Sequence, residues 1–167
     1  MAIAVRPAGV EDAGLISELN RDIQRLHADA LPRFFKAPSA DTLPEAQARE
    51  LIANPRNRVL LAFADGQPIG YVYAEVIRRA ETARHHPVAQ VYVHHISVRP
   101  AHQRRGCGDA LLAAIRNIAR AEGIAKIALD VWSFNATAKA FFAAQGFAAE
   151  NERLSMEVAL MQPARRV

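Results

Sequence analysis

Cysteine is almost missing from this sequence, and a long apolar run is missing altogether. The single thiol, Cys107, excludes an internal disulfide and a metal site of several thiolates, which fits a reducing compartment. No stretch of about 18 apolar residues occurs, and the amino-terminal stretch has an early charge and no signal-like apolar core. We therefore expect a cytoplasmic protein without a membrane segment.

Aromatic residues are also scarce, at 7%, and no internal repeat, low-complexity tract or dense acidic patch is evident. Basic residues outnumber acidic ones by 21 to 17, and this balance favours an anionic ligand, either nucleic acid or a phosphorylated cofactor. With 167 residues, half of them hydrophobic, the chain can bury one hydrophobic core without disulfide bonds or a metal ion to stabilise it. We expect a single domain over residues 1–161 and a short polar tail over 162–167.

Apolar spacing predicts strands and helices in a mixed order. Strands are expected at residues 3–6, 58–64, 69–78, 89–98, 125–131 and 153–160, and helices at 10–28, 45–53, 110–122 and 136–144. Early strand pairs and a later strand-helix-strand unit predict a mixed sheet with helices on its faces. The fold class is therefore α+β or α/β rather than a helical bundle.

A short polar loop separates the strand at 89–98 from the helix that follows it. Gly106 and Gly108 let the backbone approach a ligand, and the helix amino-terminus there favours an anion. Arg104 and Arg105 add guanidinium groups that pair well with phosphate. The alternative is that Gly106 only permits a tight turn and Asp109 stabilises the helix start.

Two common phosphate-binding motifs do not match this loop. A dinucleotide fingerprint requires glycine or alanine where Leu111 stands, and a P-loop requires Gly-Lys followed by Ser or Thr, which is absent. The loop therefore needs another explanation if it binds an anion.

The segment Gln103-Arg-Arg-Gly-Cys-Gly108 follows a strand that ends Ile-Ser-Val-Arg-Pro and precedes an apolar helix. It resembles the Q/R-x-x-G-x-G/A signature of the GCN5-related N-acetyltransferases, the GNAT family. Farther on, Asn135 to Phe147 is similar to that family's second segment, N-x-x-A-x-x-F-Y-x-x-x-G-F. Because the separation and element order also agree, the resemblance covers Val91 to Phe147 by motif and the amino-terminal half by pattern.

The resemblance implies a mixed, mostly antiparallel central sheet, flanked by helices and splayed between its fourth and fifth strands. It also implies acetyl-CoA as co-substrate, with the pantetheine arm along the fourth strand and the pyrophosphate on the loop. No clear cluster of metal ligands is present, so no metal is expected. The residues implied to bind CoA are Ile96, Ser97, Val98, Gln103, Arg104, Arg105, Gly106, Cys107, Gly108, Asn135 and Phe142.

Acetyl transfer to an amine requires a neutral nitrogen and a path for its proton. Strict strand alternation predicts that His94 and Tyr92 share one face and that His95 lies on the other. In the family, glutamate or histidine occupies the position of His94, four residues before Val98, so His94 is the predicted base or water relay. The alternative for His94 is a buried structural histidine. Glu75 is an alternative base or an anchor for the substrate ammonium.

Phe142 departs from the family pattern, because many relatives carry at that position a tyrosine that protonates the leaving thiolate. Ser133, Tyr92 or water would replace it, or the thiolate leaves unaided, which its ordinary pKa near ~8.5 allows. Cys107 occupies the variable middle position of the loop, which argues against an acylated thiol. Direct transfer in a ternary complex is therefore expected.

The acceptor is expected to be a primary amine of a small molecule or peptide, and Phe34, Phe35 and Tyr73 are expected to shape its wall. An alternative is a catalytically silent acyl-CoA-binding regulatory domain. A nucleic-acid module is not expected, since no recognition helix or aromatic stacking array accompanies the basic residues. The sequence leaves open whether two copies of the chain form a homodimer.

Overall fold

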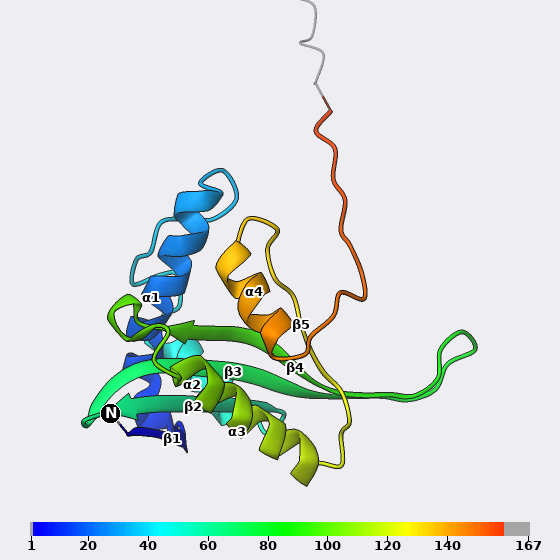
Figure 1. Ribbon diagram of the computed structural model, residues 1–167, viewed down its shortest axis with the longest axis horizontal. Helices are drawn as coiled ribbons and strands as arrows, with labels where there is room; N and C mark the ends of the chain where they lie inside the picture. Colours follow the sequence, from blue (N-terminus) through cyan, green and yellow to red (C-terminus); the bar gives the residue numbers. More distant parts are fainter. Residues whose placement is uncertain (1, 159–167) are drawn as a thin grey trace, which may run out of the picture. The chain divides into compact units, whose positions relative to one another are not determined.

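The computed structural model describes residues 2–158, in two compact units that divide after Asp130. The first unit contains one five-stranded sheet with strand order β1-β2-β3-β4-β5 (Figure 1). All neighbouring strands are antiparallel except β4 and β5, which are parallel, so the predicted mixed, mostly antiparallel sheet is confirmed. The strands are β1 (Ile3–Pro7), β2 (Asn57–Ala64), β3 (Gln67–Arg79), β4 (Val88–Val98) and β5 (Ile127–Leu129).

Three helices of the first unit cover the two faces of this sheet, and each face has its own core. They are α1 (Ala13–Ala30), α2 (Glu45–Ala53) and α3 (Cys107–Ala121). On α3 the buried residues Leu111, Ile115 and Ala119 recur every four positions, so one stripe faces the sheet. The core on the α3 side includes Val72, Ala74, Val91 and Val93. The core on the other side joins α1 and α2 to Leu61 and Tyr71.

The predicted helix over 10–28 starts three residues late, because Val10–Asp12 forms a 3₁₀ turn. The buried Asp12 carboxylate accepts hydrogen bonds from the Gly9 N–H at 2.8 Å and from the Arg6 guanidinium at 2.6 and 2.9 Å. These bonds, led by the one from Arg6, lower the pKa of Asp12. The carboxylate therefore joins β1 to the start of α1.

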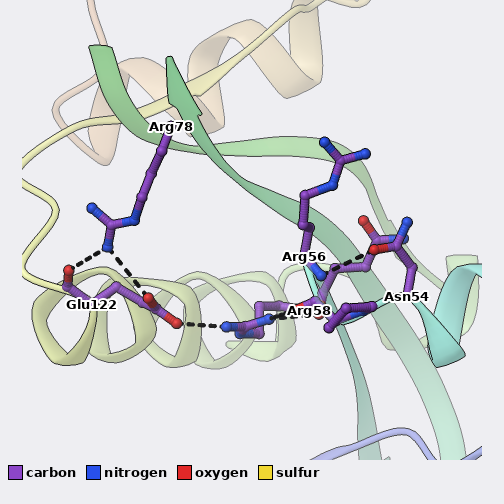
Figure 2. A network of polar contacts seen from close by, with 7 residues as sticks. Asn54, Arg56, Arg58, Arg78 and Glu122 are labelled. Atoms are coloured by element: carbon purple, nitrogen blue, oxygen red, sulfur yellow. Dashed lines mark hydrogen bonds and ion pairs between the residues drawn. The ribbon is translucent and has the colours of Figure 1, made fainter. Parts of the chain in front are cut away.

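Strand β3 extends beyond the start of β2. Asn57, the first residue of β2, pairs with Glu75, so residues 76–79 of β3 have no partner in β2. At this end of the sheet, Arg58 and Arg78 converge on the carboxylate of Glu122, at 2.5 and 3.4 Å, while the Arg56 guanidinium points away from it (Figure 2). The three-residue network joins β2 and β3 to the end of α3.

Glu122→Gln is expected to lower the melting temperature, because two guanidinium groups lose their shared counter-charge. The two arginines also lower the pKa of Glu122, with the Arg58 hydrogen bond as the largest cause. The loss should be larger in about 0.02 M salt than in about 0.5 M salt, since the network is solvent-accessible. Thermal unfolding at both salt concentrations checks this, with Glu81→Gln in the exposed β3–β4 loop as the control. An equal drop in melting temperature at both salt concentrations would contradict an electrostatic role for Glu122.

The second unit contains α4 (Ala136–Ala144), whose amino-terminus is capped by the Asn135 side chain, which accepts the Ala138 N–H at 3.0 Å. Residues 148–158 form neither helix nor strand. The strand predicted over 153–160 is therefore wrong for 153–158, and 159–160 lie outside the described residues. Its alternating side chains Leu154, Met156 and Val158 are 88%, 84% and 71% exposed, because apolar alternation alone supplies no hydrogen-bonded neighbour. The expected tail, 162–167, is also outside the described residues.

Candidate functional site

The loop between β4 and α3 has the backbone geometry of an anion cradle. Arg104 and Gly106 both adopt positive φ, 55° and 85°, the left-handed conformation found in turns whose successive N–H groups bind anions. Helix α3 begins at Cys107, and its first N–H groups have no partner within the helix. Gln103 ties the loop to the end of β4, because its side-chain amide donates to the Val98 carbonyl at 3.1 Å.

The side chains of this loop divide between solvent and core. Arg104 and Arg105 are exposed and available to an anion. Cys107 instead is 1% exposed, and burial raises the pKa of its thiol to about 11. The backbone and the two arginines thus fit a diphosphate, whereas the thiol is unsuited to carrying an acyl group.

Strand β4 loses its β5 partner halfway along. The pairing of β4 with β5 covers only residues 91–93, although β4 continues to Val98. Over residues 94–98 the edge of β4 that faces β5 is therefore unpaired within the part of the chain that the structure describes. Ile96 and Val98 direct their side chains to the α3 core, and Ser97 is buried. This opening corresponds to the predicted splay between the fourth and fifth strands.

A β-bulge in β4 overturns the prediction that the two histidines lie on opposite faces. Tyr73 pairs with His95 and the next residue, Ala74, pairs with Val93, so His94 is an extra residue without an opposite partner. Because the bulge interrupts strict alternation, His94 and His95 both contact the ring of Tyr73, with centroid distances of 4.6 and 5.8 Å. Both histidines therefore lie on the sheet face that carries Tyr73.

The bulge brings together four residues that the sequence singled out. The His94 ring stacks on Tyr73 and meets Tyr92 edge-on at 4.9 Å. Its Nε2 lies 3.3 Å from Oε2 of Glu75. The other oxygen of that carboxylate, Oε1, lies 3.6 Å from Nε of Arg56, which sequence reasoning did not identify. The result is an imidazole–carboxylate pair whose side chains are 32% and 21% exposed, with a guanidinium on the other carboxylate oxygen.

Sequence reasoning also missed a chain of hydrogen bonds that joins Asn20, Tyr71 and His95 beside this pair. The Tyr71 hydroxyl donates to Oδ1 of Asn20 at 2.9 Å and lies 3.1 Å from Nδ1 of His95. Since the hydroxyl has only one proton, Nδ1–H of His95 donates to Tyr71, and Nε2 keeps the lone pair. Asn20 is buried four residues after Ile16, within the apolar stripe of α1. A polar residue in that stripe is the signal that could have revealed the chain.

His95 should make the stability of the protein depend on pH. Burial, with smaller contributions from His94 and His27, lowers the pKa of His95 from 6.5 to about 4. Between these values the unfolded chain binds more protons than the folded one, so the free energy of unfolding falls as pH falls from about 6.5 to about 4. The lowered pKa of His95 can account for at most about 3 kcal/mol of this loss in the free energy of unfolding. Burial also lowers the pKa of His27, which acts in the same direction.

Urea unfolding at several pH values in this window checks the expectation. His95→Asn keeps a side-chain N–H for Tyr71 and should flatten the dependence, whereas His85→Asn in the exposed β3–β4 loop should not. An unchanged slope in His95→Asn would contradict it.

The predicted acceptor residues occupy two places. Tyr73 lies between the histidines and Glu75, and its pKa is raised by burial and by that carboxylate. Phe34 and Phe35 follow α1, with Phe35 stacked on His27 at 4.8 Å and Phe34 72% exposed. The Tyr73 ring contacts both histidines of the pair.

The remaining predicted residues belong to the second unit. Ser133 is exposed, and the Asn135 side chain is engaged as the α4 cap. Phe142 is buried, with ring centroids 5.3 Å from Phe141 and 5.6 Å from Phe147. Their roles at a cofactor stay predictions.

Comparison with known proteins identifies the family. The profile described as the acetyltransferase (GNAT) family matches residues 21–147. The chain belongs to the GNAT family. This membership makes it an acyltransferase, and acetyl transfer is the reaction general to the family. No curated protein matches the chain by sequence.

Solved structures agree in fold. The BH1408 tetramutant from Bacillus halodurans has a TM-score of 0.87 at 20% identity, covering 93% of this chain and 99% of its own. The aminoglycoside N-acetyltransferase AAC(6')-Iy, in complex with CoA, has a TM-score of 0.71 at 21% identity, with 95% of each chain covered. The ribosomal-protein-alanine N-acetyltransferase from Brucella melitensis biovar Abortus 2308 has a TM-score of 0.69 at 16% identity, covering 94% and 100%.

Two structural features are absent from residues 2–158. None of the helices there combines the length and apolarity needed to cross a bilayer. The same residues contain no group of three or more His, Cys, Asp and Glu side chains arranged to hold a metal ion.

Proposed function

We propose that this GNAT protein transfers an acetyl group from acetyl-CoA directly to a primary amine in a ternary complex. The observation that carries the proposal is the contact between His94 and Glu75 at the bulge of β4, where that strand loses its β5 partner. An imidazole oriented by a carboxylate is a recurrent general base. A cytoplasmic location and the absence of a nucleic-acid partner belong to the same proposal.

The residues have distinct tasks in this reaction. Glu75 accepts Nε2–H of His94, so Nδ1 is the atom that takes the proton from the amine. The carboxylate then stabilises the resulting imidazolium. The loop from Arg104 to Gly108 holds the pyrophosphate through backbone N–H groups, with the Arg104 and Arg105 side chains as counter-charges.

Acetyl-CoA, when bound, supplies the thioester carbonyl carbon that the amine attacks. The carbon–nitrogen bond forms, the carbon–sulfur bond breaks, and the thiolate takes up a proton. Phe142 has no proton to give, so Tyr92, Ser133 or water serves as the donor. Cys107 does not carry the acetyl group, because its thiol is buried and has a raised pKa.

Release of the CoA thiol in the presence of acetyl-CoA and a panel of amines tests the proposal. The panel should include small alkylamines, an aminoglycoside and a peptide with amino-terminal alanine. The last two are chosen because two similarly folded proteins are named as an aminoglycoside N-acetyltransferase and a ribosomal-protein-alanine N-acetyltransferase. Amine-dependent release with initial rates that fit a sequential mechanism is expected. Tight CoA binding without release for any amine would instead favour the silent regulatory domain.

A further inference from the structure

A charged groove adjoins the proposed base at the outer end of β3. It has a volume of about 430 Å³, which suits a small metabolite. Its charged lining consists of Arg56, Arg58, Arg78, Arg79, Glu75 and Glu122. Four cations face two anions, so the groove carries excess positive charge beside the carboxylate that contacts His94.

The excess charge is concentrated on two of the arginines. Arg58 and Arg78 share Glu122, which neutralises much of their charge (Figure 2). The Arg56 side chain is 70% exposed and only loosely paired with Glu75, at 3.6 Å. Arg79 is exposed and has no ion pair within residues 2–158. Arg56 and Arg79 are therefore the groove cations best able to bind a ligand anion.

The position along the sheet separates this groove from the cofactor loop. Glu75 pairs with Tyr92 and Arg79 with Val88, at the start of β4, whereas the loop with Gly106 follows Val98 at its end. The β3 partners of Tyr92 and Val98 are Glu75 and Gly70, and five rises of extended strand between them span about 17 Å. An anion in the groove thus lies on the acceptor side of His94, away from the proposed pyrophosphate site.

We propose that the acceptor is a small amine that carries an anionic group, a carboxylate or phosphate, at its other end. This inference rests on the proposed function, because it places the amine at His94. Glu75 complements the amine while it is still an ammonium, and Arg56 and Arg79 bind the anion. The groove thereby matches both charges of one zwitterionic molecule.

The test compares butylamine, 4-aminobutyrate and 3-aminopropyl phosphate as acceptors. For the wild type, kcat/KM is expected to be about tenfold higher for at least one of the two anionic amines than for butylamine. Which one gains more distinguishes a carboxylate from a phosphate ligand. In the double variant Arg56→Gln/Arg79→Gln this ratio should fall to about one. Arg84→Gln, in the β3–β4 loop outside the groove, is the matched control and should keep the wild-type ratio.

Calorimetric titration of 3-aminopropyl phosphate and 4-aminobutyrate without acetyl-CoA separates this inference from the proposed function. Binding that is lost in the double variant, without acetylation of any amine, would support the groove and refute the proposed reaction. Turnover of butylamine equal to that of both anionic amines would refute the groove and support the reaction. The inference is also overturned if the double variant keeps the wild-type ratio of kcat/KM between the anionic amine and butylamine. It is overturned as well if the only binding that the double variant loses is a salt-sensitive binding of oligonucleotides.

Discussion

His94→Ala is expected to lower kcat by about 10²- to 10⁴-fold on the best amine acceptor, the range typical for loss of a general base. The remaining activity would come from holding the amine and the thioester together. The variant should recover part of its rate as pH rises, because more amine is then already neutral. Steady-state kinetics between about pH 6 and pH 9.5, where both ammonium and free amine are sampled, measures this recovery.

Glu75→Gln provides the second arm of this experiment. It keeps a hydrogen-bond acceptor for Nε2–H of His94 but removes the negative charge. We expect a smaller loss than in His94→Ala, since the base remains and only the imidazolium is less stabilised. His86→Ala in the exposed β3–β4 loop is the matched control. Wild-type turnover by His94→Ala at both ends of the pH range would remove His94 as the base.

Gly70→Ala is expected to reduce the free energy of unfolding by about 2–3 kcal/mol, the cost of forcing a methyl group into a closed site. A Cβ at this position would lie 2.6 Å from the Ser97 carbonyl oxygen, and 3.3 Å from both the Cys107 sulfur and the Val98 Cα. The first contact is with backbone, so β3 and β4 must separate. Because Val98 and Cys107 border the cofactor loop, CoA affinity should fall as well.

Gly14→Ala is the matched control, since it is the same chemical change in α1. There the added Cβ meets nothing closer than a Glu45 carboxylate oxygen at 3.6 Å. Alanine is the better helix former, so this variant should gain about 0.5–1 kcal/mol. Urea unfolding of both variants, with titration of CoA, checks the pair. A neutral Gly70→Ala would show that β3 and β4 can separate at little cost.

The local parts of this fold could be predicted from the sequence. Periodicity located α2 and β2 to within one residue of their observed bounds, because a helix stripe and a strand alternation are local patterns. Glycines and arginines also marked the loop after β4, where Arg104 and Gly106 have positive φ; its role in binding the cofactor follows from the family resemblance and stays a prediction. The predicted strand at 125–131 shrank to Ile127–Leu129, because its length depends on how far β4 stays paired with it.

The face of each histidine could not be predicted. Whether His94 and His95 share a face depends on the register between β3 and β4, and nothing in the local sequence marks the extra residue. The Tyr71–Asn20–His95 chain joins residues from three elements, and its contacts exist only after packing. Arg56 was missed for the same reason, since it precedes β2 and reaches Glu75 in the next strand.

The bulge also determines how substitutions in β4 combine. His94 and His95 both contact Tyr73, and His94 contributes to the lowered pKa of His95. Residues with a shared partner show non-additive effects, so the double variant at 94 and 95 should differ from the sum of the two single variants. Substitutions that alter the reaction catalysed at this strand should therefore be sought as pairs at 94 and 95 rather than by scanning single positions.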